Sequence, residues 1–264
     1  MRFSIITVSL NAETLIKRTL SSILKQSFSD YEIIIKDGMS IDQTIQYIPD
    51  DTRIKVYVKP DNGIYDAMNQ AIDKSSGDYL IFMNCGDTFN NDFILEIINE
   101  KILFHNSPDI LYGNYVSNGM LCSQPRNLTK FYLYRTPLCH QSMIIKKMLF
   151  ETIGQYDLSF HILSDYNFTQ KCWHSNKKFI YIDEIICQYL GGGISESPQG
   201  IKRKELERID ILKKYYNKKE RFLYNLLLFF TFRRFRIWIL NGNSPLWVKH
   251  YYRKIVNKIN NSCI

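Results

Sequence analysis

The sequence predicts an α/β fold in which a mostly parallel, Rossmann-like sheet is flanked by helices. Short apolar runs alternate with segments of helical periodicity between residues 4 and 106. The apolar runs are nearly continuous, which is typical of parallel strands buried on both faces. Three of them end in polar segments, at Thr7–Asn11, Asp37-Gly38 and Asn84–Asp87. Because open parallel sheets bind ligands at the carboxyl ends of their strands, these polar ends predict one shared nucleotide site.

The first half of the chain accounts for most of this pattern. Ser4–Leu10 predicts the first strand, and Glu13–Gln26 follows with apolar residues at helical spacing. The next elements are expected at Tyr31–Lys36 (strand), Ile41–Tyr47 (short helix), Ile54–Val58 (strand), Asp66–Lys74 (helix), Tyr79–Asn84 (strand) and Asp92–Asn106 (helix). Strands that alternate with helices predict a parallel, doubly wound sheet.

The second half has a less regular pattern. Strands are expected at Ile110–Ser117, Ser142–Ile145, Phe179–Ile182 and Ile186–Tyr189, and helices at Lys147–Ile153 and Asp165–Asn176. No internal repeat or low-complexity linker separates the two halves.

Length and composition bound the class of protein. The chain has 264 residues, enough for one large domain with an appendage and a sizeable core. Its 45% hydrophobic and 14% aromatic residues argue against disorder. The first apolar run is too short for a signal peptide, so we expect a cytoplasmic protein. No two of the six cysteines have CxxC spacing, so neither a disulfide framework nor a zinc site is expected.

The net charge of +8 is unevenly distributed. Residues 216–264 contain ten Lys or Arg and one acidic residue, Glu220, and so carry 10 − 1 = +9. Residues 1–215 therefore carry 8 − 9 = −1. A nearly neutral body with a basic tail predicts that the tail has its own anionic partner.

Three motifs together carry a family resemblance. They are Ser4–Asn11, Lys59–Asn69, which contains PDNGIYDAMN, and Gly77–Asp87, which ends in an NxGD pattern. In this order they resemble the family 2 glycosyltransferases of the GT-A fold, and especially their bacterial O-antigen and exopolysaccharide branch. The resemblance covers roughly residues 3 to 200.

The resemblance implies an inverting hexosyltransferase. Such an enzyme would move a hexose or N-acetylhexosamine from a UDP-sugar to a polyprenyl-diphosphate-linked oligosaccharide, in lipopolysaccharide or other surface polysaccharide biosynthesis. It implies a GT-A domain over residues 1–215, with a nucleotide-sugar half, 1–109, an acceptor half, 110–215, and a separate tail, 216–264.

The donor nucleotide needs hydrogen bonds from strand-end loops and a carboxylate. The resemblance assigns seven residues to this role: Thr7, Ser9, Asn11, Asp37, Asn62, Gly63 and Asp66. Simpler roles stay open for several of them. Asn11 can cap the helix near Glu13, Asp37 can belong to an ordinary turn, and Asp66 can complement a helix dipole.

The donor diphosphate carries concentrated negative charge and is the leaving group. A divalent cation, a helix N-terminus or basic side chains can stabilise it. The family usually provides a DxD turn here, but this chain has Asn84-Cys85-Gly86-Asp87. Only Asp87 keeps a carboxylate at the position that binds metal in the family. We therefore expect a weakly bound Mn²⁺ or Mg²⁺, delivered with the donor, whose shell is completed by diphosphate and water. The alternative is that Asp87 only caps a turn.

Inverting transfer requires one base for the proton of the acceptor hydroxyl. The family resemblance assigns this role to Asp165, which follows Ser164 at the start of an expected helix. The alternative is that Asp165 only caps the helix. Asp157 is the rival base, and the resemblance makes it a turn residue.

Two further segments are expected at the acceptor and around the donor phosphates. His140 and Gln141 match the HQ element that lies beside the acceptor in the family, although a lone histidine is often structural. The glycine-rich segment Gly191–Ser195 is expected to form a flap, with Gly192, Gly193 and Ser195 closest to the donor. It can also be an ordinary flexible connection.

The tail combines aromatic and basic residues. Phe222–Leu240 is long enough for a membrane span of ~20 residues, but three arginines inside it make spanning unfavourable. Phe, Leu and Trp next to Lys and Arg instead predict a basic, amphipathic helical tail that lies at anionic lipid headgroups. We therefore expect peripheral association with the inner face of the cytoplasmic membrane. Packing on the body or in a dimer is the alternative, and the sequence fixes no oligomeric state.

Two other function classes are less favoured. A nucleotidyltransferase would normally have a glycine-rich, basic loop after the first strand, whereas Thr7–Glu13 contains no Gly, Lys or Arg. A non-catalytic protein that binds membranes or nucleic acid through its basic tail would not need the ordered motifs of the body. We expect no nucleic-acid partner.

Overall fold

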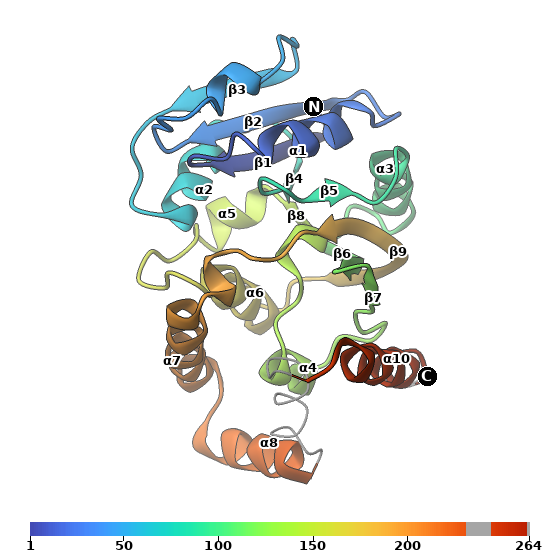
Figure 1. Ribbon diagram of the computed structural model, residues 1–264. Coiled ribbons are helices and arrows are strands. Elements are labelled where there is room, and N and C mark those ends of the chain that lie inside the picture. The colour runs from blue at the N-terminus through green and yellow to red at the C-terminus, as the bar shows by residue number, and fades with distance from the viewer. Residues whose placement is uncertain (231–243, 263–264) are drawn as a thin grey trace.

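A nine-stranded sheet runs through the residues described by the computed structural model, which are 1–230 and 244–262 (Figure 1). The order of its strands is β3-β2-β1-β4-β8-β6-β9-β5, and β7 pairs with β6 beside this path. The first half contributes β1 (Phe3–Ser9), α1 (Ile16–Leu24), β2 (Tyr31–Asp37), η1 (Ile45–Tyr47), β3 (Ile54–Val58), α2 (Ile64–Ile72), β4 (Tyr79–Phe82), β5 (Thr88–Phe89) and α3 (Ile94–Phe104).

The second half continues the sheet and ends in helices. Its elements are β6 (Ile110–Ser117), β7 (Met120–Cys122), α4 (Lys130–Arg135), η2 (His140–Ser142), β8 (Met143–Lys146), α5 (Met148–Thr152), α6 (Ser164–His174), β9 (Phe179–Tyr189), η3 (Ile194–Glu196), α7 (Pro198–Tyr215), α8 (Lys218–Phe230) and α10 (Leu246–Ser262).

Four strands of the first half, β1 to β4, are parallel, as the alternating pattern predicts. β1 pairs with β2 on one side, where Phe3 lies opposite Tyr31, and with β4 on the other, where Phe3 lies opposite Tyr79. β2 in turn pairs with β3 in parallel. The carboxyl ends of β1, β2 and β4 therefore meet at one edge, which confirms the α/β prediction and brings the three polar segments together.

The second half differs from a wholly parallel, doubly wound sheet. β8 is antiparallel to both β4 and β6, and β5 is antiparallel to β9, while β6 and β9 are parallel. The expected strands at 179–182 and 186–189 are one continuous strand, β9, with a register shift opposite Gly113. A Cβ atom at Gly113 would lie 2.7 Å from the carbonyl oxygen of Glu184, so the close approach of the two strands requires glycine here.

Alternate residues of the strands pack into two separate cores, one on each face of the sheet. On β1, Phe3 and Ile5 face the core covered by α1 and α3, whereas Ile6 and Val8 face the core covered by α2, α5 and α6. Burial on both faces explains the continuous apolar runs. The expected helix at Ile41–Tyr47 is only a single 3₁₀ turn, Ile45–Tyr47, with no buried residue.

A third apolar cluster holds the helices of the second half together. It joins Tyr134 of α4 and Tyr166 of α6 to Ile211 of α7 and Leu228 of α8. In Figure 1, α8 is the element farthest from the first strands, and α10 lies beside β7. The third cluster therefore attaches the start of the tail to the body.

A buried carboxylate fixes the amino ends of β1, β2 and β4. Glu32 is only 1% exposed and accepts hydrogen bonds from the hydroxyls of Ser4 (2.6 Å) and Ser76 (2.7 Å) and from the Lys55 ammonium (2.6 Å). Burial by itself would raise the pKa of Glu32, but the hydrogen bonds with Lys55, Ser4 and Ser76 lower it to about 2.

We expect Glu32→Gln to lower the free energy of unfolding by about 1–3 kcal/mol at pH 7, because a charged hydrogen-bond acceptor is lost from a buried network. Since the folded state depresses the pKa of Glu32, its stabilisation is present above pH 4.5 and is lost as the pH falls toward 2. Urea unfolding at pH 7 and pH 3 measures both effects. Glu100→Gln, on the exposed surface, is the control. A loss for Glu32→Gln that is no larger than the control's would contradict the account.

Candidate active site

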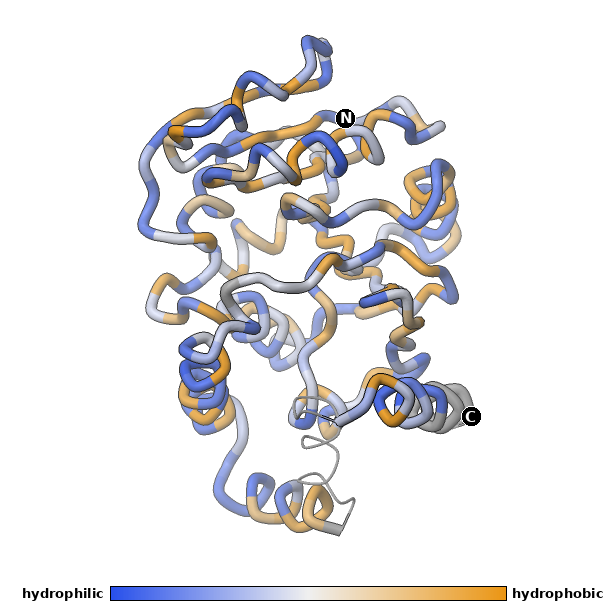
Figure 2. The backbone as a smooth tube through the Cα atoms, in the orientation of Figure 1, coloured by the Kyte–Doolittle hydropathy of each residue, from blue (hydrophilic) through white to orange (hydrophobic). Residues whose placement is uncertain are grey.

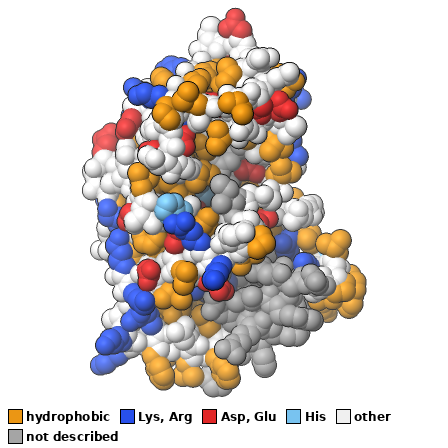
Figure 3. Space-filling view, turned by 60° about the vertical axis from the view of Figure 1, so that its left-hand side comes forward, with side chains coloured by type: hydrophobic (Ala, Val, Ile, Leu, Met, Phe, Trp, Pro, Cys, Tyr) orange, Lys and Arg blue, Asp and Glu red, His pale blue; other side chains and the backbone are white. Residues whose placement is uncertain are grey.

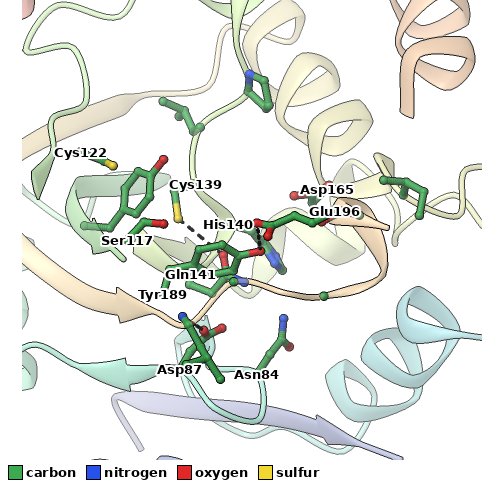
Figure 4. A pocket seen from close by; sticks show the side chains of 18 of the residues that line it. Asn84, Asp87, Ser117, Cys122, Cys139, His140, Gln141, Asp165, Tyr189 and Glu196 are labelled. Atoms are coloured by element: carbon green, nitrogen blue, oxygen red, sulfur yellow. Dashed lines mark hydrogen bonds between the residues drawn. The ribbon is translucent and has the colours of Figure 1, made fainter. Parts of the chain in front are cut away.

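A cleft of about 850 Å³ opens between the carboxyl end of β4 and the loops of the second half. Figure 4 shows Asn84 and Asp87 on one side of it, with His140 and Asp165 farther along. The lining comes from the turn after β4, from η2, from the start of α6, from the glycine-rich segment after β9, and from α4, α7 and α10. Both halves of the chain therefore contribute to one cavity.

The turn after β4 is held by a single hydroxyl. Thr19 of α1 donates to the Asp87 carbonyl (2.9 Å) and accepts the Gly86 N–H (2.8 Å). Gly86 has φ +96°, and a Cβ atom there would lie 2.5 Å from Cδ2 of Leu190. The backbone conformation therefore favours glycine at this position, and a larger residue would also have to displace the Leu190 side chain.

Asp87 is buried under the glycine-rich segment. Its carboxylate accepts the Leu190 N–H at 2.8 Å, and the side chain is 3% exposed. Burial raises the pKa of Asp87 to about 6, against the lowering effects of the Leu190 N–H, of Gln141 and of the Arg18 charge. The carboxylate is thus poorly solvated at neutral pH and would gain from a cation beside it.

Asn84 adds a side-chain amide to the same turn. Its side-chain oxygen is buried and has no hydrogen-bond partner within residues 1–230 and 244–262, and Asn84 lines the cleft beside Asp87. An amide and a carboxylate oxygen are donors that Mg²⁺ and Mn²⁺ accept. Over the same described residues, no three His, Cys, Asp or Glu side chains gather into a metal site. The two residues fit a cation that takes its other ligands from substrate and water.

Asp165 lies on the cleft wall in the first turn of α6. The buried hydroxyl of Tyr65 reaches its Oδ1 at 2.7 Å and the Ile162 carbonyl at 2.8 Å, and can donate to one of them at a time. Burial and the negative charge of Asp165 raise the pKa of Tyr65 well above its usual value, so Tyr65 stays a donor. α6 has no side-chain cap at its N-terminus, so Asp165 does not act as the N-cap.

His140 lines the cleft from η2, but most of its surface is buried. Its ring stacks on Phe82 with centroids 4.7 Å apart, and Nε2 lies 2.8 Å from the Tyr156 hydroxyl. Burial lowers the pKa of His140, while the charge of Asp165 opposes this, so the ring is neutral at pH 7. His140 therefore packs in the core and also contributes to the cleft lining.

The glycine-rich segment covers the Asp87 side of the cleft. Gly192, with φ +75°, donates its N–H to Glu196 at 2.9 Å, and the Tyr189 hydroxyl donates to the same carboxylate at 3.2 Å. Gly193 and Ser195 line the cleft between them. Gln141 lies opposite, where it hydrogen-bonds Asp87 and accepts from the Cys139 thiol at 3.5 Å.

The residues predicted to bind the nucleotide are beside this cleft and do not line it. Ser9 donates to Asp37 at 2.8 Å, and the N–H of Asn11 donates to the Ser40 hydroxyl at 2.8 Å. Asp37 is fully buried and also accepts from Ser40. Thr7 has no exposed surface and donates to the Met83 carbonyl at 2.8 Å. The Thr7 hydroxyl therefore holds the end of β1 against the end of β4.

The segment before α2 serves the helix itself. Asp66 accepts from the backbone N–H of Asn62 at 2.8 Å, and Gly63 begins the helix with φ +112°. None of these three residues lines the cleft. Of the two roles weighed for Asp66, the structure therefore shows the one at the helix N-terminus.

Sequence reasoning missed several residues of the cleft. They are Tyr65, Asn84, Arg135, Glu196, Lys204 and Arg253. Tyr65 and Asn84 lie inside quoted motifs, so the motifs themselves could have indicated them. The others lie on separate elements with no shared spacing.

Comparisons with known proteins place the chain among related sequences. The model of the family described as Glycosyl transferase family 2 matches residues 4–157. A PGL/p-HBAD biosynthesis glycosyltransferase of Mycobacterium bovis is 30% identical over 205 residues, which cover 74% of this chain and 79% of the relative. An uncharacterized glycosyltransferase of Mycobacterium tuberculosis is 32% identical over 176 residues, 62% of this chain and 66% of that protein.

Solved structures share the fold at low sequence identity. Residues 1–349 of S. aureus TarS in complex with UDP-GlcNAc match with a TM-score of 0.67 at 18% identity, over 98% of this chain and 89% of that one. A longer TarS chain is matched over only 40% of its length. The Pyrobaculum calidifontis mannosyltransferase PcManGT, with GDP-Man and Mn²⁺, matches with a TM-score of 0.60 at 13% identity, over 97% and 87%. The GT-A prediction is confirmed.

We expect Asp87→Asn to raise the free energy of unfolding at pH 8 by up to about 3 kcal/mol. The fold favours the protonated acid, so its stability falls as the pH rises from about 4 through about 6, and the amide removes this loss. Thermal or urea unfolding at pH 4 and pH 8 measures the effect, which should vanish at pH 4. Asp92→Asn, on the surface, controls for the lost charge. A variant less stable than wild type at pH 8 would refute the burial argument.

Proposed function

The chain belongs to glycosyl transferase family 2, and on that premise we propose an inverting enzyme that uses a UDP-sugar. It would move a hexose or N-acetylhexosamine to a polyprenyl-diphosphate-linked oligosaccharide. We place this reaction in surface polysaccharide biosynthesis, in the O-antigen, lipopolysaccharide and exopolysaccharide branch, on the cytoplasmic side of the membrane.

The named relatives support the donor. TarS has been crystallised with UDP and with UDP-GlcNAc, and these structures share the fold of this chain. The M. bovis relative acts in PGL/p-HBAD biosynthesis. Family membership also favours glycosyl transfer over the nucleotidyl transfer considered from the sequence.

One observation carries the proposal: a single cleft contains Asn84 and Asp87 at one place and Asp165 at another. The first pair offers oxygen ligands for the cation of a sugar diphosphate. The third residue is a carboxylate that is held by Tyr65 and still reaches the cavity. Glycosyl transfer to a hydroxyl needs both a partner for the leaving diphosphate and a base for the acceptor.

The reaction follows from this placement. The acceptor hydroxyl donates its proton to Asp165 as its oxygen attacks the anomeric carbon from the face opposite UDP. The bond from that carbon to the diphosphate oxygen breaks, and UDP leaves with the electron pair. Tyr65 donates to Asp165 and so keeps the carboxylate facing the cleft. Attack on the opposite face inverts the anomeric configuration.

The leaving group is handled by the other side of the cleft. A divalent cation, when bound, neutralises charge that develops on the diphosphate, and Asp87 with Asn84 would hold it. Leu190 donates to Asp87 immediately before the glycine-rich segment, so this segment would lie next to the diphosphate and could exclude water there.

We expect the purified protein to release UDP from one donor in a panel of UDP-sugars, with a higher rate in Mn²⁺. Asp87→Ala should lower this rate at least a hundredfold, and Asp165→Asn should lower transfer 10²–10⁴-fold while donor binding stays intact, since a general base contributes about that much. The rival Asp157→Asn is the matched control and should retain transfer within about twofold. No UDP release or UDP binding by the wild type would remove the proposal, and normal transfer by Asp165→Asn would remove the base.

We propose that the tail brings the enzyme to the membrane surface. α8 exposes Phe222 (72%) and Phe229 (74%), α10 exposes Trp247 (72%), and basic residues lie beside them. Figure 2 shows the hydrophobic stretches of α8, and Figure 3 shows hydrophobic side chains together with Lys and Arg at the lower end of the molecule. This mixture supports interfacial binding to anionic lipid.

Spanning is not supported by the helices of the structure. Within residues 1–230 and 244–262, no helix has the length and apolar character needed to cross a bilayer. The part of Phe222–Leu240 that follows residue 230 lies outside the described residues.

We expect the protein to sediment with vesicles of phosphatidylglycerol and phosphatidylcholine, and to be released by high salt. A variant with Phe222→Glu and Phe229→Glu should bind at least tenfold more weakly, because two exposed apolar anchors become acidic. Phe104→Glu, which is 80% exposed on α3, is the matched control outside the tail. Equal vesicle binding by both variants would show that the tail is not the membrane anchor.

A further inference from the structure

Three basic side chains line the cleft from three different helices. They are Arg135 at the end of α4, Lys204 on α7 and Arg253 on α10, and we call them the cationic rim. Each is half-buried. None of them has a role in the reaction described above.

The three members of the rim belong to helices that border the same cleft. Arg208 of α7 donates to the carbonyls of Tyr134 and Arg135, at 3.0 Å for Arg135, and so joins α7 to the end of α4. Lys204 lies four residues before Arg208, on the same face of α7.

The third member, Arg253, borders the cleft from α10. Arg253 donates to the Ser117 carbonyl at 3.3 Å, and its charge lowers the pKa of Cys122 against the larger effect of burial. Cys122 and Tyr132 both line the cleft, and the Arg135 guanidinium lies 5.0 Å from the centroid of the Tyr132 ring. α10, β7 and α4 therefore border the same cavity.

The rim has no acidic partner of its own. Within residues 1–230 and 244–262, none of its three members forms an ion pair, although Lys130 on α4 pairs with Glu220 and Arg203 on α7 pairs with Glu207.

The carboxylates of the cleft accept hydrogen bonds from neutral donors and form no ion pair with the rim in the described part of the chain. Asp87 accepts from Leu190, Asp165 from Tyr65, and Glu196 from Gly192. Basic side chains that face one cavity repel one another, and an anion bound between them would relieve this repulsion.

We propose that the cationic rim binds the phosphate or diphosphate group of the acceptor substrate. This inference rests on the proposed function and identifies the acceptor as an anion. Arg and Lys are the side chains that recognise phosphate oxygens. The diphosphate of the donor has the same chemistry, but we assign it to the divalent cation that Asn84 and Asp87 would hold. In Figure 1, α4 and α10 lie on the side of the structure away from β1, β2 and β3.

The rim joins the tail to the active site. Arg253 belongs to α10, and the exposed aromatic residues Trp247 and Tyr251 are on the same helix (72% and 65% exposed). A lipid-linked diphosphate at a membrane surface would meet these residues and the rim together, with the sugar chain extending toward Asp165.

Binding of inorganic pyrophosphate to the full chain tests the rim. Calorimetry is carried out with UDP and Mn²⁺ at saturation, so that the donor place is filled. The wild type should bind pyrophosphate under these conditions, and Arg135→Gln, Lys204→Gln and Arg253→Gln should each weaken it about tenfold while leaving UDP affinity unchanged. Lys204→Gln is the cleanest variant, because no hydrogen bond of its side chain is broken. Lys202→Gln, exposed on α7 and outside the cleft lining, is the matched control and should bind normally.

Each other outcome counts against the proposal. Pyrophosphate that binds only in the absence of UDP occupies the donor place, and no pyrophosphate binding beside bound UDP removes the rim while leaving the proposed function intact. Equal weakening by Lys202→Gln would show a general charge effect and not a site. If UDP itself does not bind, the proposed function fails and the acceptor assignment fails with it.

A comparison of farnesyl diphosphate with farnesol separates recognition of the phosphate groups from binding of the lipid chain. Farnesol that binds as tightly as farnesyl diphosphate would also overturn the proposal.

Discussion

The hydrogen bond from the Leu190 N–H to the Asp87 carboxylate is the interaction on which the site depends. It joins residues that are 103 positions apart and closes the cleft at the end of β4. The antiparallel pairing of β5 with β9, with Thr88 opposite Gln188, brings these two segments together. The Thr19 hydroxyl keeps the turn in the shape that points the carboxylate at Leu190. The burial that makes ionised Asp87 costly for the fold is therefore also what prepares it for a cation, so stability and function have opposite requirements at this residue.

A second long-range hydrogen bond sets the other part of the site. Tyr65 lies at the start of α2 in the first half, and its hydroxyl reaches Asp165, 100 residues later. The proposed base thus depends on the packing of α2 against α6, which share the second core with β4 and β8. The Leu190–Asp87 hydrogen bond thus orients the proposed cation ligand. The Tyr65–Asp165 hydrogen bond orients the proposed base.

The sequence was sufficient for elements whose periodicity is long and whose burial is complete. The continuous apolar runs predicted β1, β2 and β4, and helical spacing predicted α1 and α3. β5 and β7 were missed because two or three residues carry no pattern. α7 was missed because its buried stripe is short: over 18 residues it buries only Gly200, Glu207, Ile211 and Leu212.

In the site too, residues within short motifs could be predicted from the sequence, whereas residues placed by long-range contacts could not. Motifs located Asp87 and Asp165, and both line the cleft. The burial of Thr7 was not evident from the sequence, because β1 is buried on both faces and alternation does not reveal which side chains remain exposed. Tyr65 and Arg253 depend on contacts across 100 or more residues, which spacing does not encode.

A crystal structure with UDP and Mn²⁺ tests the central claim most directly. The account predicts a metal ion on Asp87 and Asn84 Oδ1 that also contacts the diphosphate, beneath the glycine-rich segment. A metal ion or UDP bound outside this cleft would contradict it.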